Sequence, residues 1–357
     1  MIVTLAALAL VTPVAGALGH RRLRRTSAAK RLRITTPNGI DESGFVRIGG
    51  VEQWVQIRGE DLSNPVVVEI HGGPGASNLA FTPYTREWER HFTIVRWDMR
   101  GTGKTFGRGG PDRQGEMSLE QLQRDSLELV QQVRERIGVG QVVLVANSFG
   151  SLIGLRLARS HPELFSAYVG TDQNINAGGR ENAAYHALVN TLSEKGKRKE
   201  LAEITAMGAD RTGWTAAQLA KFNKLVFSTD PLIMHTLKTV VLPSLWFSPL
   251  HSLRELRDGM RGQSYCEQIG PPSTHIDEWA EGTEFRIPFF VFQGARDALT
   301  PVEPARRFFD DVTAPVKGFG LIEDAGHLAS FRHPERFLEL MLAEVRPVVT
   351  GQRTADE

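Results

Sequence analysis

Beyond the N-terminal segment, short apolar runs alternate with segments whose apolar residues recur at helical spacing. Residues 45–59 alternate around a Gly-Gly pair, which predicts a β-hairpin. Continuous apolar runs such as "NPVVVEIHGG" and "QVVLVAN" predict strands that are buried on both faces. Between them, the segment that starts at Ser118, with Gln121 at the capping-box position, and ends at Gly138 predicts a helix. Strands that alternate with helices predict an α/β fold with a mostly parallel sheet flanked by helices.

This alternation is interrupted in residues 173–284. The pattern there is mostly helical, with Gly and Pro between segments such as "GWTAAQLAKF" and "SPLHSLRELRDGM". Strand–helix alternation then resumes with "PFFVFQGARD" and ends with "HPERFLELMLAEVR". We therefore expect a core made of residues 41–172 and 285–349, with a helical cap, residues 173–284, inserted over the carboxyl edge of the sheet.

The N-terminal segment has a third pattern. Residues 1–19 carry no charge, and as a helix they would span about 28 Å of a bilayer. Residues 20–40 form a basic linker with seven Lys and Arg residues and no acid before Asp41. Positive charge after the apolar run favours a membrane anchor with the catalytic domain in the cytoplasm. Two alternatives remain open: a signal peptide cleaved near "AGA", residues 15–17, with export of the protein, or a plain extension.

Composition narrows the classes of function. The 42 Lys and Arg residues nearly balance the 41 Asp and Glu residues, so no overall field favours nucleic acid as a partner. Cys266 is the only cysteine, which excludes an internal disulfide and a cysteine-based metal site. The ten histidines lack the spacing of a helical zinc site. We expect no cofactor and no metal, and a small molecule or short peptide as substrate.

The stretch "VLVANSFGSLIGLRLA" places Ser148 at an abrupt change from strand to helix. The turn nearly matches Gly-x-Ser-x-Gly, the elbow that carries a nucleophilic serine, with Ala146 at the first glycine position and Gly150 retained. In such an elbow the hydroxyl points clear of the helix, and the N–H of the next residue, Phe149, points into the same space. The competing interpretation is that Ser148 is an ordinary helix N-cap.

A nucleophilic serine requires a base and a carboxylate that orients the base. Asp297 and His327 each follow a predicted strand, and the order Ser, Asp, His is the one expected for this elbow. Asp172, at the end of "YVGTD", is the rival acid. Because it lies near Ser148, it is also the favoured partner for a free amine on the substrate. Acids of the cap are further candidates for that role: Glu181, Asp230 and Glu267.

The stretch "HGGPGAS", residues 71–77, also follows a buried strand, and its glycines allow the backbone to approach a substrate closely. The N–H groups of Gly73 and Phe149 are the predicted donors to the oxyanion of an acyl-transfer intermediate. A simple turn is the competing interpretation of this stretch.

The motifs "HGGPG", "WDMRGTGKT", "NSFGS", "GARDALTP" and "DAGH", in this order, resemble the proline iminopeptidase branch of the α/β-hydrolase family from about residue 40 to residue 346. The resemblance implies an α/β-hydrolase fold with Ser148 as nucleophile, Asp297 as acid and His327 as base, and with Gly73 and Phe149 as oxyanion donors. Family aminopeptidases usually carry Trp where this chain has Phe149.

Three functions therefore remain open. The first is a serine hydrolase that cleaves a small amide through an acyl-enzyme, as a proline iminopeptidase-like aminopeptidase does. The second is an esterase, lactonase or amidase that acts on an uncharged small metabolite. The third is a ligand-binding protein with a hydrolase fold and no catalysis. The presence of all three triad residues favours an enzyme.

Overall fold

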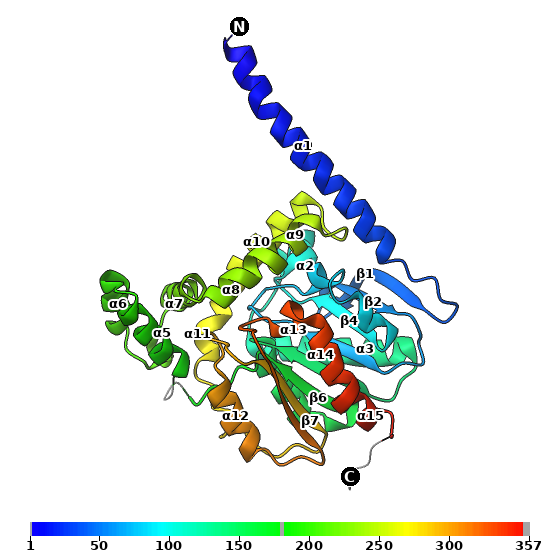
Figure 1. The fold of residues 1–357 in the computed structure, drawn as a ribbon. Helices are drawn as coiled ribbons and strands as arrows, with labels where there is room; N and C mark the ends of the chain where they lie inside the picture. Colours follow the sequence, from blue (N-terminus) through cyan, green and yellow to red (C-terminus); the bar gives the residue numbers. More distant parts are fainter. Residues whose placement is uncertain (1, 179–181, 353–357) are drawn as a thin grey trace.

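Figure 1 shows the computed structural model, in which helices surround one central sheet and a long N-terminal helix projects from the domain. The structure describes residues 2–178 and 182–352, with side chains from residue 16 onward. Glu181, a predicted cap acid, and the side chains of most of the predicted anchor lie outside the described residues.

The sheet has eight strands in the order β1-β2-β4-β3-β5-β6-β7-β8. β1 and β2 form the predicted hairpin and pair antiparallel, β2 pairs antiparallel with β4, and the remaining neighbours are parallel. This is the predicted mostly parallel sheet. The strands are β1 (Ile40–Ile48), β2 (Val51–Gly59), β3 (Val66–Ile70), β4 (Thr93–Asp98), β5 (Val142–Asn147), β6 (Phe165–Thr171), β7 (Phe289–Gly294) and β8 (Lys317–Ile322).

Helices cover both faces of the sheet, because the central strands are apolar on both sides. One face packs against α3, α4 and α12, and the other against α13, α14 and the π-helical η8, which Figure 1 shows in front of the strands. The bounds are α2 (Gly103–Gly109), α3 (Leu119–Ile137), α4 (Gly150–Ser160), α12 (Val302–Asp311), α13 (Ala329–Arg332), α14 (Pro334–Leu340), η8 (Met341–Val345) and α15 (Arg346–Val349).

The elements between β6 and β7 are helical and form their own apolar cluster, which includes Leu192, Trp214, Phe222 and Val226. The helix α8 continues through the π-helical η6 into α9. These elements are α5 (Ala183–Glu194), α6 (Arg198–Thr205), η5 (Arg211–Gly213), α7 (Ala216–Thr229), α8 (Pro231–Thr236), η6 (Leu237–Val241), α9 (Leu242–Phe247), α10 (Leu253–Cys266), η7 (Glu267–Ile269) and α11 (Gly270–Ser273). Because α8 begins beside the His327 loop, these helices lie over the carboxyl edge of the sheet.

The N-terminal helix α1 (Ile2–Arg31) continues well into the segment predicted as a basic linker. Its last turns are attached to the domain, since Ala28 and Leu32 are buried and the Arg58 guanidinium donates to the Leu32 carbonyl. Within the described residues, no single helix is both long and apolar enough to cross a membrane. One pair, Ala216–Thr229 with Pro231–Phe247, meets that test jointly but is bent by 81°.

Candidate active site

Ser148 lies at the turn between β5 and α4, where the sequence predicts a nucleophile elbow. Its backbone φ is +52°, a left-handed conformation that costs free energy in a non-glycine residue and is expected at such an elbow. Hydrogen bonds hold the turn: Ser148 N–H donates to the Thr171 carbonyl at 3.0 Å, and Ser151 N–H donates to the Ser148 carbonyl at 2.9 Å. The strained position is thus fixed by β6 on one side and by α4 on the other.

The alanine in the elbow is accommodated by a glycine further along the helix. Ala146 is completely buried, and a Cβ atom on Gly154 would lie 2.5 Å from the Ala146 Cβ. Any side chain at position 154 would therefore collide with the elbow. Gly150 is required in the same way, because a Cβ there would lie 2.3 Å from the Ile70 carbonyl oxygen of β3. Sequence reasoning noticed Gly150 and missed Gly154, whose only signal was its position one helical turn after Gly150.

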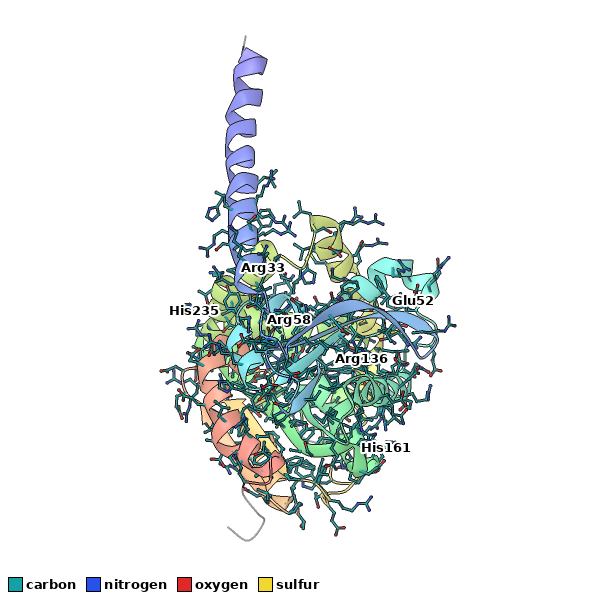
Figure 2. All side chains as sticks on the ribbon, turned by 90° about the vertical axis from the view of Figure 1, so that its right-hand side faces the viewer. Arg33, Glu52, Arg58, Arg136, His161 and His235 are labelled. Carbon is teal, nitrogen blue, oxygen red and sulfur yellow. The ribbon has the colours of Figure 1, made fainter. Side chains whose placement is uncertain are left out.

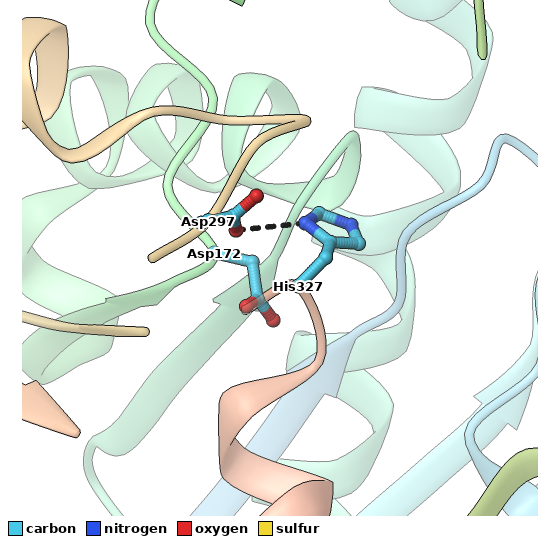
Figure 3. A group of neighbouring side chains, drawn as sticks. All are labelled: Asp172, Asp297 and His327. Atoms are coloured by element: carbon cyan, nitrogen blue, oxygen red, sulfur yellow. Dashed lines mark hydrogen bonds and ion pairs between the residues drawn. The ribbon is translucent and has the colours of Figure 1, made fainter. Parts of the chain in front are cut away.

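Asp297 and His327, from the loops after β7 and β8, meet at the carboxyl edge of the sheet (Figure 3). His327 Nδ1 lies 2.8 Å from Asp297 Oδ2, and both residues are 5% exposed. The Asp297 carboxylate also accepts hydrogen bonds from the N–H groups of Leu299 and Thr300 and from the Thr300 hydroxyl. These donors fix the carboxylate, and the carboxylate in turn fixes the ring so that its Nε2 is left to act as a base.

Asp172, the rival acid, lies at the end of β6 in the same cluster. Its side chain is completely buried, and protein donors occupy its carboxylate: Asn147 Nδ2 at 2.7 Å, Leu328 N–H at 2.9 Å and Ala329 N–H at 3.3 Å. Asp172 therefore joins the residue before Ser148 to the residues after His327. Leu328, like Asp172, has a positive φ, so the backbone here is bent to meet this carboxylate.

The two carboxylates determine the protonation of the base. Burial alone would lower the pKa of His327, but the charges of Asp297 and Asp172 outweigh it and raise this pKa to about 9. Burial also raises the pKa of Asp172 to about 6, an effect that the His327 charge opposes. The cluster thus stabilises a positively charged imidazole, the form that the base adopts after it accepts a proton from a nucleophile.

Asp172, Asp297 and His327 each offer a ligand atom within 4.8 Å of the others, a spacing that would also suit a metal ion. The hydrogen bonds above already use these oxygens and His327 Nδ1. An ion would have to replace these donors, and the observed hydrogen-bond network fits an acid–base pair better.

The predicted oxyanion loop runs directly beside the elbow. A Cβ on Gly72 would lie 2.8 Å from the Ser148 Cβ, which places the loop against the serine. Gly73 has a φ of +122°, and Phe149 occupies the N-cap position of α4. Neither the Gly73 nor the Phe149 N–H donates to another group of residues 2–178 and 182–352. The two N–H groups are therefore available to a substrate oxygen.

The cap contributes one acid close to the base. Asp230 is the N-cap of α8 and accepts hydrogen bonds from the Leu232 and Ile233 N–H groups at 2.7 and 3.0 Å. Leu232 packs against Gly326, the residue before His327, and the Asp230 charge is among those that raise the pKa of His327. Glu267, another predicted cap acid, is exposed at the end of α10.

A small hollow between cap and core, with a cavity volume of about 30 Å³, lies beside the Asp297 loop. It is lined by Gln173, Arg211, Trp279 and Thr300 among others, and neither Ser148 nor His327 lines it. This hollow borders the acid rather than the elbow, so we do not place the scissile bond there.

Comparison with known proteins agrees with this geometry. A family model described as the α/β-hydrolase fold matches residues 65–334. The chain is 23% identical to "Probable aminopeptidase YbaC" of Bacillus subtilis over 84% of this chain and 94% of that protein. It is 22% identical to "Proline iminopeptidase" of Lactobacillus delbrueckii subsp. bulgaricus over 83% and 95% of the two chains. The solved structure of a membrane phospholipase A, described as a bacterial virulence factor, superposes with a TM-score of 0.59 at 18% identity and covers 98% of this chain and 99% of its own.

Proposed function

The chain belongs to the α/β-hydrolase fold family, in its proline iminopeptidase-like branch, and from this premise we propose that it is a serine hydrolase in which Ser148, His327 and Asp297 form the catalytic triad. The observation that carries the proposal is the 2.8 Å contact between buried His327 and Asp297, at the same sheet edge as a serine with a positive φ. A structural N-cap would need neither the strained backbone nor the oriented imidazole.

The proposed reaction passes through an acyl-enzyme. His327 Nε2 removes the proton from the Ser148 hydroxyl as its oxygen attacks the substrate carbonyl carbon, and Asp297 stabilises the resulting imidazolium. The N–H groups of Gly73 and Phe149 donate to the oxygen that becomes negative. The imidazolium then protonates the leaving amine or alcohol. A water molecule, activated by the same imidazole, releases the acid from Ser148.

A fluorophosphonate probe, which reacts with activated serines, tests this proposal directly. We expect the probe to label the unsubstituted protein and the Ser160→Ala variant, in which an exposed helix serine is lost, but not Ser148→Ala. Labelling of Ser148→Ala at the normal rate would refute the assignment.

For the substrate, we propose an aminopeptidase that acts on a short peptide or an aminoacyl amide. A buried ammonium needs a carboxylate partner, because an unpaired charge away from water is costly. Asp172 was favoured for this role by its position in the sequence, but its carboxylate is fully buried and already accepts three hydrogen bonds. The half-buried Asp230, on the cap beside the His327 loop, is better placed to meet the amine.

A matched pair of substrates separates this proposal from an esterase or amidase that acts on uncharged metabolites. We expect aminoacyl arylamides to be cleaved at least about 10-fold faster than their N-acetylated forms, since one charge-assisted contact contributes on the order of 1.5–3 kcal/mol. Asp230→Asn should raise KM for the free-amine substrate and leave that for aryl acetates unchanged. Equal cleavage of free and acetylated substrates would favour the esterase or amidase alternative.

A further inference from the structure

Large hydrophobic side chains that remain exposed are concentrated on three helices. Among the side chains of residues 16–178 and 182–352, seven large hydrophobic ones are exposed; six of them belong to α1, α9 and α10, and the seventh is Tyr84. Leu23 is 73% exposed, Met260 64% and Leu242 58%. The complete set on the three helices is Leu18, Leu23, Leu242, Trp246, Leu253 and Met260. Exposed hydrophobic residues that gather in one region indicate a contact surface.

The three helices form one surface because α1 is attached to the cap. Arg21 Nε donates to the Trp246 carbonyl at 2.9 Å, and its guanidinium lies 5.3 Å from the centre of the Trp246 ring. Arg25 Nε donates to the Ser248 carbonyl, also at 2.9 Å, in the loop that joins α9 to α10. Figures 1 and 2 show α9 and α10 on the side of the domain from which α1 projects.

The same surface is rich in positive charge. The domain-proximal part of α1 and the residues just after it carry exposed basic side chains and no acid: Arg22, Arg24, Lys30, Arg31 and Arg33. On α10, Arg254, Arg257 and Arg261 are 79%, 65% and 60% exposed. All three lie 3.7 to 3.9 Å from one nearly buried carboxylate, Asp258, which cannot neutralise them. Their spacings of three and four residues put them on one side of α10, next to exposed Met260, while the helix packs against α2.

We propose that the surface formed by α1, α9 and α10 binds an anionic lipid bilayer, with α9 and α10 at the level of the headgroups. Exposed apolar side chains among arginines have the composition of an interfacial helix, whose apolar groups enter the acyl boundary while its bases meet lipid phosphates. The uncharged run of residues 1–19 leads away from the domain on this side. A second copy of the chain fits less well, because two such basic surfaces would repel each other.

This proposal does not depend on the proposed reaction. Lipid binding concerns α9 and α10, which contribute neither the nucleophile nor the base. The continuous segment from Asp230 to Trp246 nevertheless links the His327 loop to the lipid-binding surface. Contact with a bilayer would therefore orient the helices that lie over the active site.

A polarity-sensitive fluorophore on a single new cysteine tests the contact in the full chain. The fluorophore is attached to the new cysteine of the Met260→Cys variant. Native Cys266 is only 1% exposed, and any reaction of the fluorophore with it is measured on the unsubstituted protein. Glu163→Cys is the matched control: residue 163 is 64% exposed and adjoins the region of His161, which Figure 2 shows on the side away from α1. Both proteins are incorporated into phosphatidylcholine vesicles with and without phosphatidylglycerol.

We expect the emission of the label at position 260 to shift to the blue when phosphatidylglycerol is present, and that at 163 to stay unchanged. The shift should decrease in about 1 M salt, where the screening length falls to about 3 Å, and in the triple variant Arg254→Glu, Arg257→Glu, Arg261→Glu. An unchanged thermal unfolding temperature of that variant shows that its fold is intact, and the salt series tests the same charge dependence without substitution. Equal emission at 260 and 163 in these vesicles, or a shift at 260 that grows with protein concentration without lipid, would overturn the proposal.

Discussion

The carboxyl edge of the sheet and the cap over it are stabilised in different ways. At the edge, backbone geometry and hydrogen bonds set the positions: of the four non-glycine residues with positive φ in the described chain, Ser148, Asp172 and Leu328 lie around the site. The cap is held mainly by its own apolar cluster around Trp214 and Phe222. Directional hydrogen bonds define one arrangement of the edge residues, whereas a cluster of apolar side chains can repack. We therefore propose that the edge carries the catalytic residues and that the cap selects the substrate.

The largest expected effect comes from removing the edge chemistry. Ser148→Ala and His327→Ala should each lower kcat by about 10⁵-fold or more, and the double variant should be little worse, because triad residues act as a unit. The thermal unfolding temperature of each variant should stay close to that of the unsubstituted protein, so the loss of turnover would not be due to unfolding. Independent, multiplicative losses would show that the two residues do not work together.

The two carboxylates of the edge should differ in effect. Asp297→Asn should lower kcat by about 10⁴-fold, since an amide in its place favours the wrong imidazole tautomer. Asp172→Asn should lower kcat much less, by about 10-fold, because the asparagine retains one oxygen that can accept from the Leu328 and Ala329 N–H groups. Both values come from steady-state kinetics on one aryl ester. The reverse order would identify Asp172 as the catalytic acid.

The pH profile distinguishes the two acids further. A base must be neutral to accept a proton, so kcat/KM should rise with pH up to about 9, the pKa that the neighbouring carboxylates give His327. Asp172→Asn removes a negative charge, which lowers the pKa of His327 and moves this rise to lower pH by about one unit. Asp324→Asn, which alters an 83% exposed carboxylate three residues before the base, should leave the profile in place. An unchanged profile in Asp172→Asn would contradict the charge coupling.

A defect in the cap should have the smallest effect on the chemistry. Phe222→Ala removes a 2% exposed ring from the cap cluster and should destabilise the cap by about 3–5 kcal/mol. We expect faster proteolysis within residues 183–273 and a raised KM, with fluorophosphonate labelling of Ser148 retained. If the variant with a destabilised cap also lost fluorophosphonate labelling of Ser148, the geometry of the sheet edge would depend on the cap.

The strands and helices of the core could be predicted from the sequence because each is specified by residues within its own segment. Continuous apolar runs specify β3 and β5, and Ser118 and Gly138 cap α3 as the pattern predicts. The elbow and the order of Ser148, Asp297 and His327 could be recognised for the same reason. These three residues remain predictions about catalysis, although the structure brings Asp297 and His327 together.

The features that sequence reasoning missed depend on distances between elements. The contact between Gly154 and Ala146 exists only after β5 and α4 have packed. An aspartate at a strand end has the same sequence pattern whether it meets a substrate or, as Asp172 does, the N–H groups of another loop. The basic run after residue 19 looked like a linker, since nothing local shows that Arg21 and Arg25 donate to carbonyls of the cap.

The attachment of α1 also determines how the domain can move. Arg21 and Arg25 bond to the cap, and the Leu32 carbonyl accepts from Arg58 of β2, so the helix is held along its last turns rather than at one end. A domain on a flexible linker samples all orientations around its attachment point. Because α1 is attached to the domain at several points, the helix and the domain are expected to rotate together. We therefore expect the carboxyl edge of the sheet to keep a fixed orientation relative to the axis of α1.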